Sequence, residues 1–150
     1  MAKMLDPLVI NIDVCGICNE SCNYCPRSQG YDNRKEYMSL EVFKNFIETV
    51  NDWGYTGFIC WSGRGENSLH PQHSAMIKIL HHKHRKYKTR ILTNGYKWEQ
   101  RKELFNMFDV MILNTYSTKE ETARRKEAFP WADVRFWDQS VEPDEWEVTP

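Results

Sequence analysis

Short apolar segments alternate along the chain with longer segments in which apolar residues recur at helical spacing. Residues 8–14 alternate between two faces, which predicts a strand with one side in a core. Asn11 and Asp13 lie on its polar side, and Cys15 follows on that side. Its apolar side comprises Leu8, Ile10, Ile12 and Val14. Further strands are predicted at residues 56–61, 88–93, 109–114 and 133–137.

Helices are predicted in the intervals between these strands. They cover residues 40–53, 73–84, 97–107 and 119–129. Ser39 is suited to cap the first helix, which should stop near Gly54. Thr118 and Glu121 have capping-box spacing at the start of the last helix.

The alternation of strands and helices predicts one α/β domain. Parallel neighbours need a crossover connection, so strands separated by helices pair in parallel. We expect the domain to cover residues 1–138, followed by an irregular acidic tail at residues 139–150. Functional groups in such folds collect beyond the carboxyl ends of the strands. No apolar run reaches the roughly eighteen residues of a membrane span, and the first residues lack a signal core, so a cytoplasmic protein is expected.

The cysteines provide the candidate chemistry. Cys15, Cys18, Cys22 and Cys25 lie within eleven residues, which favours reduced thiols or metal ligation over a disulfide framework. Three ligands from Cys18, Cys22 and Cys25 would leave one iron of a 4Fe-4S cluster open, whereas a fourth from Cys15 would close it for electron transfer. A zinc site is a further alternative, although Cys18 and Cys22 are closer in sequence than the halves of a zinc ribbon. Cys60, in an apolar strand, is expected to be a small buried side chain.

Charge gives little indication of a partner. The chain has 20 basic and 21 acidic residues, so its overall charge does not favour nucleic acid or an anionic membrane. Residues 78–90 are locally basic and contain three histidines. A solvated helix end is the favoured interpretation over a phosphate-bearing partner, and the flanking cations oppose a metal site there.

Three segments together resemble a known family. Radical S-adenosylmethionine (radical SAM) enzymes have a cluster loop that residues 18–27, CNESCNYCPR, closely resemble, including the aromatic Tyr24 before the third cysteine. Residues 62–66, SGRGE, resemble the family's glycine-glycine-glutamate motif, and residues 69–71 resemble the sequence that often follows it. Residues 93–95, TNG, are also similar to many members.

The resemblance implies a partial, shortened (β/α) barrel with helices outside the parallel strands. About five strands are predicted here, whereas the family core has six strand-helix units. The barrel is therefore trimmed, or a partner subunit or a second copy closes it. Two residues also depart from the family pattern: Arg64 stands where glycine is common, and Asn67 where proline is common.

The resemblance also implies a reaction. A 4Fe-4S cluster on Cys18, Cys22 and Cys25 would bind S-adenosylmethionine (SAM) at its open iron. One electron, from a donor such as flavodoxin or ferredoxin, would cleave SAM to a 5'-deoxyadenosyl radical that abstracts hydrogen from an unidentified substrate. The alternative is a noncatalytic or electron-transfer iron-sulfur module completed by a partner chain. Contacts to SAM are expected from Tyr24, Gly63, Gly65, Glu66, Asn94, Asn114 and Ser117.

Overall fold

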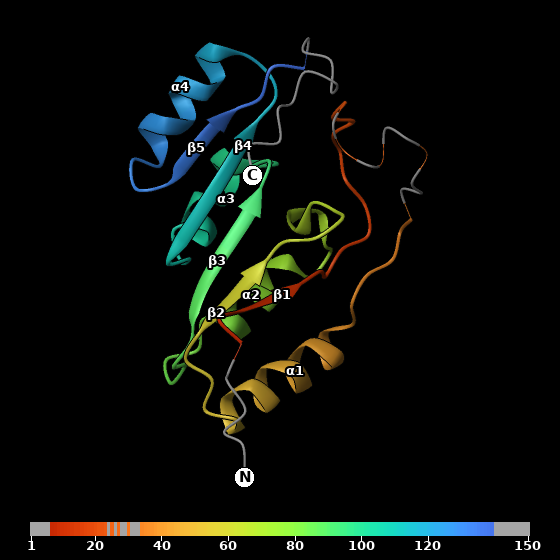
Figure 1. Ribbon diagram of the computed structural model, residues 1–150, viewed down its shortest axis with the longest axis vertical. Helices are drawn as coiled ribbons and strands as arrows, with labels where there is room; N and C mark the ends of the chain where they lie inside the picture. Colours follow the sequence, from red (N-terminus) through yellow and green to blue (C-terminus); the bar gives the residue numbers. More distant parts are fainter. Residues whose placement is uncertain (1–6, 24, 26, 28–29, 31–33, 140–150) are drawn as a thin grey trace.

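Five parallel strands form a single sheet in the order β1-β2-β3-β4-β5 (Figure 1). The computed structural model describes residues 7–23, 25, 27, 30 and 34–139. The strands are β1 Val9–Ile12, β2 Phe58–Trp61, β3 Lys88–Thr93, β4 Val110–Thr115 and β5 Asp133–Phe136. The predicted α/β fold with five parallel strands is confirmed.

Each connection between strands carries a helix. The helices are α1 Leu40–Asp52, α2 His73–Leu80, α3 Trp98–Phe105 and α4 Lys119–Ala128. Because the strand order follows the chain order, every crossover advances in the same direction, and right-handed crossovers then place the helices on one face. This is the winding of a barrel segment. No helix among the described residues has the length and apolarity needed to cross a bilayer.

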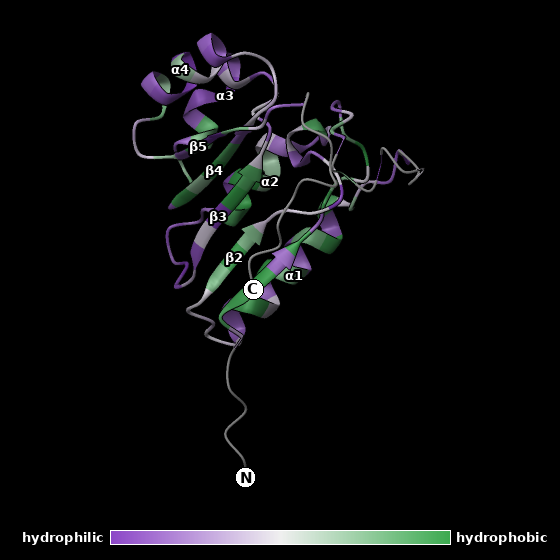
Figure 2. Ribbon diagram, turned by 45° about the horizontal axis from the view of Figure 1, so that its top comes forward, coloured by the Kyte–Doolittle hydropathy of each residue, from purple (hydrophilic) through white to green (hydrophobic). Residues whose placement is uncertain are grey.

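Alternate strand residues on the helix-covered face form the core. Ile12, Trp61, Ile91 and Met111 occupy one row across four paired strands, and all four are buried. The Trp61 ring stacks 6.1 Å from the ring of Phe43 on α1 and 5.3 Å from the ring of His73 on α2. Figure 2 shows α4 mostly hydrophilic, and the only α4 residue buried is Thr122. The core is therefore concentrated under α1 and α2.

The other face of the sheet, called the open face below, carries a different set of side chains. Its central members are Asn11 on β1, Cys60 on β2, Arg90 on β3, Ile112 and Asn114 on β4, and Arg135 on β5. All of these except Cys60 are half-buried or exposed. Asn11, Cys60 and Arg90 are direct register neighbours. The centre of the open face thus combines polar side chains with the apolar side chains of Leu92, Val110 and Ile112.

The predicted helix caps are confirmed. The Ser39 hydroxyl accepts a hydrogen bond from the Val42 amide at 3.2 Å, and the Thr118 hydroxyl accepts one from the Glu121 amide at 3.1 Å. Gly54 follows α1 with a φ of 72°, a conformation that favours glycine. These local signals set the helix ends as the sequence indicates.

Several predicted boundaries are wrong. Leu8 precedes β1 and is 85% exposed, so it does not belong to the apolar face of that strand. The second strand begins at Phe58 rather than residue 56, and α2 ends at Leu80 rather than residue 84. Helix α3 is shorter than predicted at both ends, and β4 is displaced by one residue. Most of the acidic tail, residues 140–150, lies outside the described residues.

The basic segment after α2 has a structural role. His81 lies between the Ile77 carbonyl and the Thr89 hydroxyl, so it joins the end of α2 to β3. Arg85 binds both carboxylate oxygens of Asp109, which also accepts hydrogen bonds from Thr89. Burial would raise the pKa of Asp109, but these hydrogen bonds outweigh it and lower the pKa to about 2. These contacts turn the chain from α2 into β3, which is why the helix stops early.

His73 makes stability depend on pH. It is 2% exposed, and burial, together with Arg101 and His70, lowers its pKa to about 3. The unfolded chain therefore binds a proton below about pH 6.5 that the folded chain does not, so stability falls as pH drops. Between pH 7 and pH 5 we expect this one group to cost about 2 kcal/mol.

The His73→Phe variant tests this expectation. Phenylalanine keeps an aromatic ring beside Trp61 but cannot be protonated. Urea unfolding at pH 7 and pH 5 should show that the wild-type chain loses about 2 kcal/mol more stability than the variant. Equal losses in both chains would mean that His73 is not held neutral by the fold.

Candidate functional site

The loops that follow β1, β2 and β3 meet at one rim of the sheet. The first is the cysteine loop, residues 15–27, and the second is residues 62–66. The Ser62 amide donates to the Ile12 carbonyl at 3.2 Å, and the Glu66 amide donates to the Ile17 carbonyl at 2.8 Å. The two loops therefore run together beyond the carboxyl ends of their strands.

Two glycines permit this close contact. A Cβ atom on Gly65 would lie 1.9 Å from the Cys15 carbonyl oxygen and 2.6 Å from that of Ile17. A Cβ atom on Gly63 would lie 2.2 Å from Cγ of Asp13. In both cases the space that glycine leaves free is filled by the chain itself. Their predicted contact with SAM stays a prediction.

Glu66 joins the three loops through a buried carboxylate. The side chain is 3% exposed. Oε1 accepts hydrogen bonds from the Thr93 hydroxyl at 2.7 Å and from the Ser68 amide at 3.0 Å. Oε2 accepts a hydrogen bond from the Asn94 amide at 2.7 Å. Glu66 thus fixes the end of β3 to the loop after β2 and, through its own amide, to the cysteine loop.

Asn94 continues this connection to the cysteines. Its Nδ2 donates to Oδ1 of Asn19 at 3.0 Å and approaches Sγ of Cys18 at 3.8 Å. Its Oδ1 accepts from the Tyr96 amide at 2.9 Å, which forms the turn into α3. Asn94 therefore places an N–H group beside the first of the three predicted ligands.

The three predicted ligands lie on the rim, and none of them is in a disulfide. Cys22 is buried, whereas Cys18 and Cys25 are half-buried. Burial raises the pKa of Cys18, and the nearby charges of Glu66 and Cys22 raise it further. Among residues 7–23, 25, 27, 30 and 34–139, no three His, Cys, Asp or Glu side chains converge closely enough to hold a single metal ion.

The chemistry of this donor set fits an iron-sulfur cluster. Cysteine thiolates are the ligands that such clusters take, and none of these cysteines is used in a disulfide. The Glu20 amide, at 3.5 Å, and Nδ2 of Asn94 both direct N–H groups at Sγ of Cys18, and donors of this kind stabilise negative charge on a ligating sulfur. Ligation by Cys18, Cys22 and Cys25 stays a prediction.

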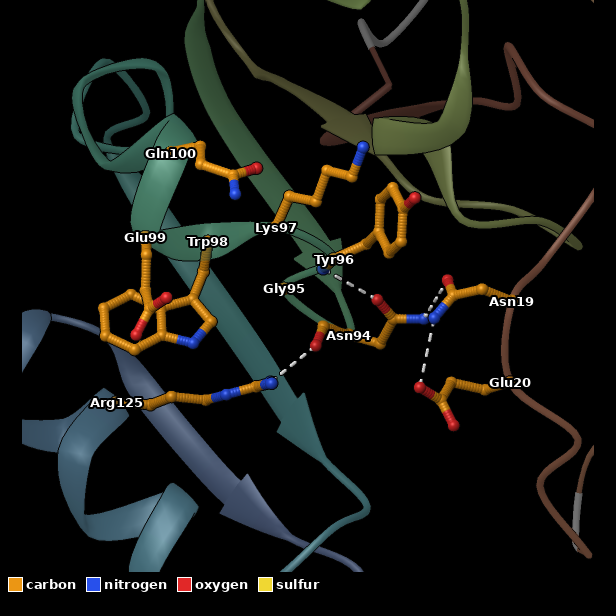
Figure 3. A pocket seen from close by; sticks show the side chains of 10 residues that line it. All are labelled: Asn19, Glu20, Asn94, Gly95, Tyr96, Lys97, Trp98, Glu99, Gln100 and Arg125. Carbon is orange, nitrogen blue, oxygen red and sulfur yellow. Dashed lines mark hydrogen bonds between the residues drawn. The ribbon is translucent and has the colours of Figure 1, made fainter.

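A cavity of about 300 Å³ adjoins this rim. Figure 3 shows Asn19 and Glu20 of the cysteine loop on one side of it and the start of α3 on the other. Arg125 of α4 donates to the Asn94 carbonyl at 2.6 Å and is paired with Glu121 at 2.8 Å. The cavity lies at the lower end of the volumes usual for ligand pockets.

Comparison with known families identifies the chain. A model of the Radical SAM superfamily matches residues 12–135. The chain belongs to the radical SAM superfamily. No curated protein sequence matches it.

Solved structures of the protein BtrN have a similar fold. BtrN in complex with AdoMet and 2-DOIA has a TM-score of 0.72 at 19% identity, over 88% of this chain and 57% of that chain. SeMet BtrN in an open conformation has a TM-score of 0.64 at 22% identity, over 93% of this chain and 59% of that chain. The chain thus spans less than two thirds of either BtrN chain.

The two departures from the radical SAM motif have local explanations. The Arg64 amide donates to Oδ2 of Asp13 at 3.1 Å, and its side chain lies 3.6 Å from the same carboxylate. Oδ1 of Asn67 accepts from the Val14 amide at 3.3 Å, while its Nδ2 is buried without a partner. Asn67 begins a short 3-10 helix, η2 Asn67–Leu69, that the sequence did not predict.

Cys15 has surroundings unlike those of the other loop cysteines. It is 1% exposed and packs in the hydrophobic core, and its Sγ donates to the Ile17 carbonyl at 3.8 Å. Its backbone forms an antiparallel bridge with Tyr37. Burial raises the pKa of this thiol. These surroundings favour a structural role over ligation in a radical SAM site.

Sequence reasoning missed the contacts that fasten the cysteine loop. Nε of Arg27 donates to the Arg64 carbonyl at 2.6 Å, and its guanidinium also donates to the Gly16 carbonyl. The Asn23 amide donates to Oε1 of Gln139 at 3.1 Å, and its Nδ2 donates to the Gln139 carbonyl at 3.0 Å. Arg27 could have been suspected because it adjoins the cluster motif, but nothing in the sequence indicates the partner of Asn23.

The remaining predicted SAM contacts, Asn114, Ser117 and Tyr24, take no part in the hydrogen bonds described above. Oδ1 of Asn114 accepts from the indole N–H of Trp137 at 2.9 Å, and Ser117 is exposed. Tyr24 lies outside the described residues. These three assignments stay predictions.

Replacement of Glu66 should loosen the rim. In Glu66→Gln, an amide NH2 group must face at least one of the donors that now bind the carboxylate, which leaves a buried donor without an acceptor. We expect the free energy of unfolding to fall by about 1–3 kcal/mol. Denaturant unfolding of the cluster-free chain measures this loss.

Glu48→Gln provides the matched control, because Glu48 is exposed on α1 and should lose little stability. If Glu66→Gln is as stable as this control, the buried carboxylate does not hold the loops together.

Proposed function

We propose that this chain is a radical SAM enzyme that binds a 4Fe-4S cluster on Cys18, Cys22 and Cys25 and cleaves SAM reductively. The observation that carries the proposal is the meeting of the cysteine loop, Glu66 and Asn94 at one rim of a partial barrel. Membership of the superfamily supports it, as does a fold similar to that of BtrN, a protein solved in complex with AdoMet.

The residues of the rim have separate tasks in this proposal. When bound, a reduced cluster would supply the electron for the reductive cleavage of SAM. Cys18, Cys22 and Cys25 would hold three of its irons and leave the fourth for SAM. Asn94 and the Glu20 amide donate toward Sγ of Cys18 and thereby stabilise its negative charge.

Glu66 acts mainly by positioning the loops. An ionised carboxylate offers about four lone-pair sites, and three hydrogen bonds from Thr93, Ser68 and Asn94 already occupy its oxygens. One site on Oε2 stays available, and the ammonium group of SAM is the donor expected there. Gly63 and Gly65, which precede Glu66 in the chain, have no Cβ atom and so allow residues 62–66 to lie against the segment that follows β1.

Two kinds of protein partner are proposed. An electron donor such as flavodoxin or ferredoxin supplies the electron, and a cytoplasmic location is part of the proposal. A partner subunit or a second copy is proposed to close the barrel, because β1 and β5 are the edge strands of the described sheet. The rival function is a noncatalytic or electron-transfer iron-sulfur module, which would hold the cluster without consuming SAM.

Product analysis tests the enzyme proposal. Anaerobically reconstituted protein incubated with SAM and dithionite should release 5'-deoxyadenosine. Cys18→Ala, Cys22→Ala and Cys25→Ala should each abolish both the cluster spectrum and the product, because each removes one iron ligand. Cys15→Ala serves as the control and should retain both.

The opposite pattern would reverse the ligand assignment: loss of the cluster in Cys15→Ala with retention in Cys18→Ala. A fully loaded cluster that forms no 5'-deoxyadenosine would favour the electron-transfer module.

Asn94 should tune the reduction potential. Hydrogen bonds to cluster sulfurs favour the reduced state, which carries more negative charge. In Asn94→Leu the N–H group beside Cys18 is lost, so the midpoint potential should become more negative. A redox titration followed by electron paramagnetic resonance measures it. Asn51→Leu, on α1, is the control, and an equal potential in all three proteins would contradict the role of Asn94.

A further inference from the structure

Arg90 lies near the middle of the open face. It is the third residue of β3, and its register neighbours are Cys60 on β2 and Val110 on β4. Register neighbours in a parallel sheet project on the same side. The side chain of Arg90 is half-buried, and its Nε donates to Sγ of Cys60 at 3.1 Å. This contact holds the guanidinium group over the sheet.

The charge of Arg90 is not neutralised by the described part of the chain. No carboxylate of these residues lies within 4 Å of its guanidinium nitrogens. Two other arginines do have carboxylate partners: Arg135, also on the open face, pairs with Asp133 at 2.6 Å, and Arg85 pairs with Asp109 at 2.8 Å. Arg90 therefore keeps its terminal N–H groups for another acceptor.

The shape of this group limits what that acceptor can be. A guanidinium presents parallel N–H donors that match the two oxygens of a carboxylate or phosphate. Burial of a cation without a counter-ion is unfavourable, and a bound oxyanion removes that cost. Asn11, two strands away on β1, adds a polar group to the same face, and its Oδ1 accepts from the Ser62 hydroxyl at 3.3 Å.

We propose that the open face binds a substrate through an anionic group, a carboxylate or a phosphate, held by Arg90. This inference rests on the proposed radical SAM function. Arg90 lies four residues before Asn94, which is about 13 Å along the strand at 3.3 Å per residue. The anionic group is thus held away from the rim, and the remainder of the substrate extends toward the cysteine loop. Arg90 sets the substrate class and its orientation.

The competing interpretation is an arginine whose stem packs on the sheet while its head is solvated. Such a residue would affect stability but would have no saturable affinity for anions. A binding measurement separates the two interpretations, because it detects the occupied guanidinium directly.

The test uses the full chain with its reconstituted cluster and no SAM. The Nε–H signal of Arg90 is identified by its absence from the NMR spectrum of Arg90→Gln. Acetate and inorganic phosphate are titrated separately to distinguish a carboxylate from a phosphate site, and acetamide is the neutral probe. At least one anion should give a saturable shift of this signal, and acetamide should give none.

Variants then report the affinity through backbone signals of β2 and β3. Arg90→Gln should weaken anion binding about ten- to hundredfold, as expected for loss of charge-assisted hydrogen bonds. Arg90→Lys, which keeps the charge but lacks the fork, should give an intermediate affinity. Arg135→Gln, on the same face, should bind as the wild type does.

Absence of saturable binding in the wild type, or equal affinity in wild type and Arg90→Gln, would overturn the inference. A comparable response to acetamide would also overturn it. The outcome is independent of SAM cleavage: binding without 5'-deoxyadenosine formation would refute only the proposed function, and 5'-deoxyadenosine formation without anion binding would refute only the role of Arg90.

Discussion

The buried carboxylate of Glu66 is the constraint on which the rim depends. It collects donors from the end of β3 and from η2, and its own amide binds the cysteine loop. A carboxylate with so little exposure is tolerated only because its oxygens accept hydrogen bonds. The cysteine loop, the loop after β2 and the end of β3 are therefore held together by the hydrogen bonds of one residue. The position of the thiols on the rim depends on these bonds.

The order of the strands gives the two faces of the sheet different roles. Sequential strand order sends the helices to one face, where Trp61 and its aromatic neighbours form the core. The other face is left with side chains that do not contribute to that core, including Arg90. Packing and ligand recognition thus use alternate residues of the same strands, so a one-residue shift of register would exchange them.

The sequence predicted what depends on local pattern and failed where tertiary contacts decide. Ser39 and Thr118 indicated helix starts because capping is a local interaction. Leu8 has the correct alternation but is 85% exposed, because the described part of the chain does not cover it, and the pattern could not show this. The rule that the carboxyl ends of parallel strands share a rim predicted that Glu66 and Asn94 lie at the same edge of the sheet, but not that they are hydrogen-bonded. The pairing of Arg90 with Cys60 required the register itself.

The two hydrogen bonds between Asn23 and Gln139 have a consequence for biosynthesis. They join residues 116 positions apart, one in the loop after β1 and the other after β5. At about 5–20 residues per second, the ribosome needs about 6–23 seconds to reach Gln139 after it has made Asn23. During that interval the loop can already bind residues 62–66, but it lacks the contact with Gln139. The cysteine loop is therefore anchored on both sides only after the last strand has been synthesised.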